Sequence, residues 1–504
     1  MADKLLLGID VGTSSCKVTI FNLKGEVVAQ ESSDHKTYYP HDGWVEQDPM
    51  EWWDGICRSI KKIKSNGNIN FNDIAGIGLD GQSWSAIPID KNGNVLDRTP
   101  IWMDTRASKI CDDLVQQIGK KEIFDISGND LHPTYSLPKI LWLKENKSDI
   151  FNKTVKFLQS NSFIGYKLTG VMSQDPSQAY GLYFYNMRTG KYDLDLLKKF
   201  KLSIDLFPEI MNCDQVIGVI NSESSEETGL PIGIPVVAGG LDAACGALGA
   251  GVISSGQTQE QGGQSGGMSL CLNEDEYKSD PRLILSRHVI PNKLLLQGGT
   301  VGGAGVARWL LKNFCKEEQL ESEKNDSNPF HEMDITAVKT KPGADGLIFL
   351  PYMSGERSPI WNAKAKGIYY GLDFSKTRGH LIRASYEGVA YSLEHNLKIA
   401  EESSANIQEL YAMGGAANSV FWTQIKADVT GKRILVPSSD TATTLGAAIL
   451  AGIAIGAYSS YEDAINKTVE IKKIYEPNPD NKATYKKGFE KYLQIYDNLK
   501  ILMK

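Results

Sequence analysis

The feature that most constrains the fold is a repeated plan of a strand, a glycine-rich turn and a second strand. It occurs first in "LLLGIDVGTSSCKVTIFN" (5–22) and again in "TQEQGGQSGGMSLCLNE" (258–274). In each copy, residues typical of strands flank Gly, Ser and Thr residues that suit a tight turn. The chain has 504 residues, too many for one hydrophobic core. The repeat predicts two domains of similar topology that face each other.

Other segments predict further strands and helices. "NLKGEVVAQ" turns at Lys24-Gly25 into a third strand, and "IAGIGLDGQSWSAIPID" is a later strand and loop. "DPMEWWDGICRSIKKI" predicts a helix with Asp48 as its N-cap and Pro49 at its first position. We expect further helices near 106–119 and 138–147.

Several segments from residue 233 onward are rich in small residues. The stretch 233–252 would suit a crossing point between two domains, and "ELYAMGGAANSVFWTQIKADVTG" (409–431) is typical of a strand, a glycine turn and a helix. "TATTLGAAILAGIAIG", which follows, predicts a helix able to pack closely on a backbone or a ligand. The Lys-rich end, 475–504, predicts a polar surface helix.

Composition excludes several classes of partner. The net charge of −7 and the pI of about 5.7 argue against nucleic acid or an anionic membrane as partners. No apolar run reaches the ~18–20 residues of a membrane-spanning helix, and Met1–Lys4 is too short for a signal peptide. The seven cysteines form no CxxC pair, which favours a reducing, cytoplasmic setting.

Asp10 ends an apolar strand, where a buried carboxylate is costly unless it is paired or bound to a metal. Gly12 allows close backbone approach, and Thr13, Ser14 and Ser15 add hydroxyl and N–H donors. The stretch suits a polyphosphate, with Asp10 holding Mg²⁺ through water. An ordinary turn with a solvent-facing Asp explains the same letters. The chain has no GxxxxGK[ST] motif, so it would not bind a nucleotide with a P-loop.

Asp242 is the second carboxylate of interest, because the small and apolar residues of "GGLDAACGALG" surround it. Desolvation there would raise its pKa toward the range of a general base. The alternative is an N-cap that opens a small-residue helix, and both roles can hold together.

The glycines of "GGTVGGAGVARWLL" (298–311) raise the alternative of a nicotinamide dehydrogenase. The spacing breaks the GxGxxG pattern, and no ribose-binding acid follows about 20 residues later. These glycines, Gly303 among them, could still approach a nucleotide in another fold.

Together these stretches resemble the FGGY family of carbohydrate kinases over about 5–480. The motifs that carry the resemblance occur in the family's order: "GIDVGTSS", "TYSLPKILWLKEN" (134–146), "AGGLDAACGALGAG", "GGQSGG", "LPYMSGERSP" (350–359) and "GGAANSVFWTQIKADVTG". The resemblance implies an α/β fold of two ribonuclease-H-like, actin-like ATPase domains with a cleft between them. These would span 1–245 and 246–480, and a C-terminal helix would span 481–504.

The resemblance also implies Mg²⁺- and ATP-dependent phosphorylation of a sugar or polyol hydroxyl. Asp242 matches the general base and Asp10 the carboxylate linked to Mg²⁺. Many family members carry Thr where this chain has Gln264. The residues expected to bind ATP are Thr13, Ser14 and Ser15 in the first loop, Gly263, Gln264, Ser265 and Gly266 in the second, and Gly303, Gly414, Gly415 and Asn418 on the nucleotide side.

The segment "GLDGQSWSAI" (78–87) lies where family members contact their sugar, and "IWMDTR" (101–106) is expected near it. Glycerol-specific members carry Arg-Glu after the Gln, which makes glycerol an unfavourable substrate here. Xylulose-specific members carry Gln-Met-His, and Asn where this chain has Ala243, yet the overall resemblance is greatest to them. We expect Gln82, Ser83, Trp84, Trp102, Asp104 and Asp242 to bind the substrate.

D-xylulose, giving D-xylulose 5-phosphate, is the best single substrate. Another ketose or a polyol is the alternative, and an actin-like ATPase that couples nucleotide to protein binding is a more distant one. A homodimer is the family's common habit.

Overall fold

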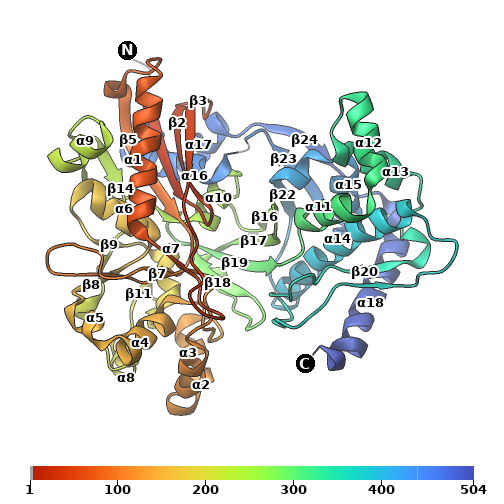
Figure 1. Cartoon of the computed structure of the whole chain (residues 1–504), viewed down its shortest axis with the longest axis horizontal. Helices are drawn as coiled ribbons and strands as arrows, with labels where there is room; N and C mark the ends of the chain where they lie inside the picture. Colours follow the sequence, from red (N-terminus) through yellow and green to blue (C-terminus); the bar gives the residue numbers. More distant parts are fainter. Residues whose placement is uncertain (1–3, 440, 504) are drawn as a thin grey trace.

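The protein is described by a computed structural model covering residues 4–439 and 441–503. It consists of two lobes, each built on a seven-stranded mixed sheet (Figure 1). The first lobe contains the N-terminal hairpin and the second contains the hairpin near residue 260.

The first sheet has the order β13–β14–β5–β1–β2–β3, with β15 beside the end of β5. β1 runs antiparallel to β2 and parallel to β5, so the predicted hairpin and third strand are confirmed. The strands are β1 (Leu5–Val11), β2 (Ser15–Asn22), β3 (Val27–Asp34), β5 (Ile74–Gly81), β13 (Val216–Val219), β14 (Pro235–Val237) and β15 (Gly240–Leu241).

The second sheet repeats this arrangement in the order β18–β19–β17–β16–β22–β23–β24. β16 runs antiparallel to β17 and parallel to β22, as β1 does to β2 and β5, which confirms the predicted repeat. The strands are β16 (Gln257–Gly262), β17 (Gly266–Asn273), β18 (Ile284–Arg287), β19 (Lys293–Thr300), β22 (Glu409–Met413), β23 (Arg433–Pro437) and β24 (Ile471–Tyr475).

Helices cover both faces of the first sheet. On one face lie α1 (Pro49–Ser65), α6 (Ser160–Thr169) and α9 (Ser222–Thr228), and on the other lies α16 (Ala442–Ala454), crossed by α10 (Asp242–Gly249). The start of α1 is as predicted: Pro49 is its first residue, and the Asp48 side chain accepts a hydrogen bond from the N–H of Met50 at 2.9 Å.

The small residues of α16 and α10 allow unusually close packing. A Cβ added to Gly78 on β5 would lie 1.7 Å from the carbonyl oxygen of Ala447, and one on Gly446 would lie 1.9 Å from that of Cys245. Any side chain at these glycines would therefore separate α16 from β5 or from α10. The predicted close-packing helix is confirmed, and its neighbours are strand and helix backbones.

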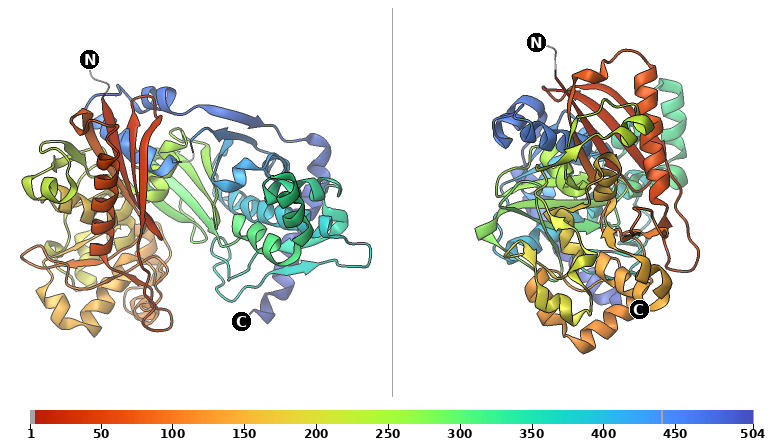
Figure 2. Two further views of the ribbon diagram at one scale, coloured as in Figure 1. Left: turned by 45° about the horizontal axis from the view of Figure 1, so that its top comes forward. Right: turned by 90° about the vertical axis from the view of Figure 1, so that its left-hand side faces the viewer.

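The late segment of the chain returns to the first lobe. α16 and α17 (Tyr461–Thr468) lie beside the strands of the first sheet, and the chain then reaches β24 of the second sheet (Figures 1 and 2). We expected the second domain to span 246–480. In the structure, α16 belongs to this range but packs on the strands of the first sheet.

Six further helices and four short strand pairs complete the first lobe. The helices are α2 (Ser108–Gln117), α3 (Lys120–Ser127), α4 (Ser136–Asn146), α5 (Ser148–Lys153), α7 (Pro176–Ala179) and α8 (Leu194–Lys199), so the helices expected near 106–119 and 138–147 are present. The short strand pairs are β4 (Glu46–Gln47) with β7 (Thr99–Pro100), β6 (Ile87–Ile89) with β8 (Lys156–Leu158), β9 (Ser173–Gln174) with β12 (Glu209–Ile210) and β10 (Tyr185–Asn186) with β11 (Lys191–Tyr192).

The second lobe is completed by six helices and one strand pair, which are α11 (Ala304–Phe314), α12 (Lys316–Asn325), α13 (Pro329–Val338), α14 (Arg378–Glu402), α15 (Val420–Thr430), α18 (Lys482–Leu499), and β20 (Ile348–Leu350) with β21 (Ile368–Tyr370). The prediction of a surface helix over 475–504 is wrong in part. Tyr475 ends β24, and α18 buries Tyr485, Phe489 and Tyr492 in a core cluster, because these aromatics recur on one helix face.

No helix within residues 4–439 and 441–503 is both long enough and apolar enough to cross a membrane. All seven cysteines are buried, and none of them forms a disulfide.

Candidate active site

A cleft of about 560 Å³ lies between the lobes, and the turns of both hairpins reach it. The first lobe contributes the β1–β2 turn and the start of α10, and the second contributes the β16–β17 turn and β19. The structure therefore brings together the two turns that the sequence repeat singled out. The expected site residues that line this cleft are Thr13, Ser83, Trp84, Trp102, Asp242, Gly263, Ser265, Gly266 and Gly414.

Asp10 lies near the end of β1, and only 4% of its surface is exposed. The Lys17 ammonium lies 3.4 Å from its Oδ2, while its Oδ1 has no hydrogen-bond partner in the described chain. An unpartnered, buried carboxylate oxygen fits a hard cation such as Mg²⁺. Among residues 4–439 and 441–503, no three His, Cys, Asp or Glu side chains are arranged to hold a metal. Phosphate and water oxygens would have to complete the coordination.

Asp80, which the sequence analysis did not single out, faces Asp10 on the neighbouring strand. The two residues are register partners of parallel β1 and β5. Asp80 is fully buried, and no donor in the described chain reaches either of its carboxylate oxygens. Burial first, and then the charge of Asp10, raise the pKa of Asp80 well above its usual value. The shared pattern of "GIDVG" and "GLDGQ", a strand ending in Asp-x-Gly or Asp-Gly, is a signal that could have revealed it.

Asp242 lies one strand further along the same edge. β15 pairs with the end of β5, where Gly240 is the register partner of Asp80, and Asp242 follows β15 directly as the first residue of α10. The alternative role as N-cap is wrong, because Leu241 occupies the N-cap position. Burial and the charge of Asp10 raise the pKa of Asp242 to about 7, which suits a proton acceptor near neutral pH.

The second turn is held from behind by the start of α11. The N–H groups of Ala304 and Gly305 donate to the carbonyl oxygens of Gly263 and Gln264, at 2.8 and 3.1 Å. A Cβ on Gly303 would lie 2.4 Å from the carbonyl carbon of Ser265. Gly303 thus permits this close approach and does not line the main cleft, and the Gln264 side chain is exposed beside α11.

Two other residues expected at the first loop also lie outside the cleft lining. Ser14 is exposed, and its carbonyl oxygen accepts a hydrogen bond from the N–H of His35. Ser15 begins β2, and its carbonyl oxygen accepts one from the N–H of Gly12 at 3.1 Å. These contacts shape the turn, while Thr13 alone of the three lines the cleft.

A second, mostly apolar cavity of about 830 Å³ opens in the second lobe. Gly415 and Asn418 line it, together with the stacked rings of Tyr386 and Trp422, whose centres lie 4.3 Å apart. Gly414, with φ of +85°, precedes Gly415 and lines the main cleft. The Gly-Gly turn therefore stands between a cleft of mixed polarity and a mostly apolar cavity, an arrangement that suits the phosphates and the base of one nucleotide.

Aromatic side chains from the first lobe form the other end of the cleft. Trp84 adopts φ of +61° and stacks on Tyr135 with ring centres 4.1 Å apart, and its Nε1 has no partner in the described chain. Trp102 donates from Nε1 to Oγ1 of Thr13 at 2.9 Å, which ties this wall to the first loop. Tyr180, missed by the sequence analysis, completes the wall.

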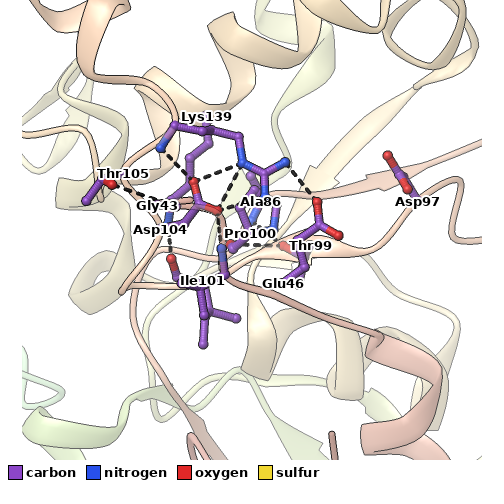
Figure 3. Close-up of polar contacts among 12 residues, drawn as sticks. Gly43, Glu46, Ala86, Asp97, Thr99, Pro100, Ile101, Asp104, Thr105 and Lys139 are labelled. Carbon is purple, nitrogen blue, oxygen red and sulfur yellow. Dashed lines mark hydrogen bonds and ion pairs between the residues drawn. The ribbon is translucent and has the colours of Figure 1, made fainter. Parts of the chain in front are cut away.

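Gln82 and Asp104, expected to bind substrate, do not line the cleft. Both side chains are fully buried: Gln82 donates from Nε2 to Oε1 of Gln47 at 2.7 Å, and Asp104 accepts a 2.6 Å hydrogen bond from the N–H of Val45. Asp104 also pairs with Arg106 at 2.7 Å (Figure 3). The structure does not bring these two side chains to the cleft, because both point into the lobe, where they satisfy buried partners.

Lys139 of α4 links this buried network to the aromatic wall. Its Nζ donates to the carbonyl oxygens of Trp84 and Ile101, at 2.9 and 2.7 Å. Ile101 immediately precedes Trp102, so one ammonium fixes the backbone beside both tryptophans. Burial lowers the pKa of Lys139 to about 7.

Comparison with known proteins agrees with this geometry. The model of the FGGY family of carbohydrate kinases, N-terminal domain, matches residues 5–249, and that of its C-terminal domain matches 269–455. The chain belongs to the FGGY family of carbohydrate kinases. It is therefore a phosphotransferase with the family's two-domain, actin-like and ribonuclease-H-like fold, and ATP is its expected co-substrate.

Individual FGGY kinases resemble the chain along its whole length. The xylulose kinase of Staphylococcus xylosus is 29% identical, with 98% of this chain and 99% of that protein covered. The structures of the ligand-bound xylulose kinase and of the gluconate kinase from Lactobacillus acidophilus each match with a TM-score of 0.89 and 26% identity over 98% of both chains. Relatives with different substrates thus match equally well.

Two cations that line the cleft of this FGGY kinase were missed in the sequence. Lys17 comes from β2 and Arg357 from the loop after β20. The "SSCK" and "SGERSP" stretches place them next to recognised family motifs, a signal that was available.

Proposed function

We propose that this FGGY kinase transfers the γ-phosphoryl group of ATP to a hydroxyl of a ketopentose, with D-xylulose as the best substrate and D-xylulose 5-phosphate as product. The observation that carries the proposal is the single cleft that Asp242 shares with both glycine-rich turns. Phosphoryl transfer requires such positioning of donor, acceptor and base more than it requires covalent catalysis.

Three uncharged side chains beside Asp242 support a neutral sugar. Ser83 and Tyr180 carry hydroxyls and Trp84 carries ring surface, which suit sugar hydroxyls and the apolar face of a sugar. The names of the relatives agree, since xylulose kinases are frequent among them, although a gluconate kinase matches too.

The chain's own residues divide the work. The Asp242 carboxylate accepts the proton of the attacking hydroxyl, and its pKa of about 7 matches that task. Thr13, Ser265 and the amides of Gly263 and Gly266 face the phosphates. The Gly415 and Asn418 cavity takes the adenosine end. Burial of the acceptor against Trp84 excludes water that would otherwise be phosphorylated.

Mg²⁺ is part of the proposal. Asp10 would hold it through its unpartnered Oδ1, with Asp80 beside it, and the ion would neutralise phosphate charge. The cytoplasmic location and the homodimer stay predictions.

An ADP-release assay over pentuloses, hexuloses, polyols and aldonic acids tests the function. We expect kcat/KM for D-xylulose to exceed that of the next compound by about tenfold or more. If another ketose or a polyol gives the highest kcat/KM, the substrate assignment changes while the reaction, ATP-dependent phosphorylation, stays the same. ATP hydrolysis that no compound stimulates would contradict the proposal and favour the actin-like ATPase.

A further inference from the structure

Arg357 is the one arginine among the described residues that line the main cleft, and nothing above gives it a role. It follows β20 in the loop that contains "SGERSP". It lines the same cleft as Asp242 of the first lobe and Gly266 of the second turn.

The guanidinium of Arg357 lies against the strand next to the second hairpin. Its Nη2 lies 3.4 Å from the carbonyl oxygen of Thr300, and a Cβ on Gly299 would lie 3.0 Å from its Cζ. Thr300 is the register partner of Gly266, the residue at which the second turn ends. Arg357 therefore stands directly beside the second phosphate turn.

The same guanidinium also faces the first lobe. Its Cζ lies 5.5 Å from the ring centre of Trp102, within the range of a cation–π contact. Trp102 in turn donates to Oγ1 of Thr13 in the first turn. Arg357 thus approaches the point where the two turns come together.

No carboxylate of the described chain forms an ion pair with the Arg357 guanidinium, although the next residue in the chain, Glu356, is close enough for its charge to act on it. Arg378 and Arg383 pair with glutamates, whereas Arg357 has no such partner. Oε1 of the neighbouring Glu356 accepts hydrogen bonds from the backbone N–H groups of Val301 and Arg357, at 2.7 and 2.8 Å. Lys17, the other cation of the lining, already has Asp10. A guanidinium stays charged at all working pH values, so an anion from the ligand is its natural counterion.

We propose that Arg357 binds the oxygens of the phosphoryl group in transit and stabilises their charge in the transition state. This inference rests on the proposed function. The transfer stays balanced: the sugar oxygen bonds to the γ-phosphorus, the bond to the ADP oxygen breaks, and the hydroxyl proton passes to Asp242. The planar fork of a guanidinium suits two phosphoryl oxygens at once, which an ammonium does not.

Steady-state kinetics of Arg357→Met and Arg357→Lys form the first test. We expect kcat to fall about 100-fold or more for Met and about tenfold or more for Lys, because an interaction confined to the transition state is lost. The KM for the sugar should change less than about threefold, since ground-state binding is retained. Arg58→Lys on α1, where the arginine only donates to Oγ of Ser33, is the matched control with unchanged kinetics.

A binding measurement gives a readout that needs no turnover. Mg·ADP with aluminium fluoride mimics the phosphoryl group in transit, and its affinity can be followed by Trp fluorescence. We expect Arg357→Met to weaken this complex by about 100-fold while affinity for Mg·ADP alone stays within about threefold. Native circular dichroism of both variants shows that folding is intact, and the Lys variant serves if the Met variant does not fold.

Three results would overturn the inference. One is unchanged kcat with a raised KM, which would make Arg357 a contact for a sugar hydroxyl or for the carboxylate of an aldonic acid. The second is equal loss of Mg·ADP and of the fluoride complex, which would make it a ground-state nucleotide contact. The third is no change in either measurement. If the wild-type protein shows no sugar-dependent turnover, the proposed function fails, while the fluoride complex still decides the role of Arg357.

Discussion

The two hairpins share one topology, but the buried carboxylates on and beside them differ in whether a close cation pairs with them. On β16 of the second lobe, Glu260 is 4% exposed and pairs at 2.6 Å with Lys426, itself 1% exposed. On β1 of the first lobe, Asp10 pairs with the half-exposed Lys17 at 3.4 Å, and Asp80 beside it has no ion-pair partner among the described residues.

The difference separates two tasks within one architecture. A buried charge with a close partner is locally neutral, so the second turn can offer backbone amides to phosphate without a competing charge. Unpartnered carboxylates store unfavourable energy that a bound cation or a proton relieves. Asp10, Asp80 and Asp242 lie on adjacent strand ends of the first lobe. The proposed function therefore assigns the reactive end to the first lobe and phosphate binding by backbone amides to the second.

The largest effect should follow from changing the reactive end. We expect Asp242→Asn to lower kcat by about 10²–10⁴-fold, the usual contribution of a general base, with nucleotide affinity within about threefold. ADP release and fluorescence titration with ATP measure the two quantities. Asp195→Asn, on an exposed carboxylate of α8, is the control that should behave as wild type. Sugar-dependent turnover that survives in Asp242→Asn would remove the contrast between the lobes.

The neutralised pair of the second lobe should instead show itself in stability. Lys426→Met leaves Glu260 buried without its partner, and we expect the free energy of unfolding to fall by about 3–5 kcal/mol. Urea denaturation measures this, and a second change, Glu260→Gln, should recover most of the loss. Lys432→Met breaks the more exposed pair with Glu401 and should cost at most about 1 kcal/mol. Equal losses in the two single variants would show that Glu260 and Lys426 are not a special pair.

Asp80→Asn should raise the free energy of unfolding, whereas Lys426→Met lowers it. Its amide can donate to Asp10, and the buried charge disappears, so we expect the ligand-free protein to gain about 1–3 kcal/mol near pH 8. The folded-state pKa of Asp80 is raised, so the wild type loses stability as pH rises above the ordinary carboxyl value of about 4. Below that pH the two proteins should converge.

Asp175→Asn is the matched control for Asp80→Asn. Asp175 is equally buried, but Ser177, Gln178 and Asn161 all donate to its carboxylate. Its replacement should therefore destabilise the protein. A destabilised Asp80→Asn variant would mean that this carboxylate has a favourable role in the ligand-free lobe.

Local patterns explain what the sequence predicted well. The two strand–turn–strand stretches, the Asp48 cap and the small-residue helix α16 depend on neighbouring letters, and all appear in the structure. Asp242 was found for the same reason, since small residues on both sides imply desolvation.

The features that the sequence did not reveal depend on partners distant in the chain. The exposure of Gln82 and Asp104 is decided by Gln47 and Val45, which reach them only after the lobe has folded. The pairing of Asp10 with Asp80 requires the register of two parallel strands, which the sequence does not specify. Lys426 is likewise assigned to Glu260 by strand order and helix packing alone.

The smallest predicted effect concerns pH and sharpens the view of the first lobe as the reactive one. Only the ionised carboxylate of Asp242 accepts a proton, and its pKa is raised to about 7 by burial and by the charge of Asp10. Activity should therefore fall as pH drops through this value, with kcat/KM at pH 6 about tenfold below its alkaline plateau. Initial rates across pH 5–9 at low sugar concentration measure the profile, and the residual activity of Asp242→Asn should lack this limb. A limb near pH 4 instead would show that Asp242 titrates as an ordinary surface carboxylate and that the first lobe does not store charge at its strand ends.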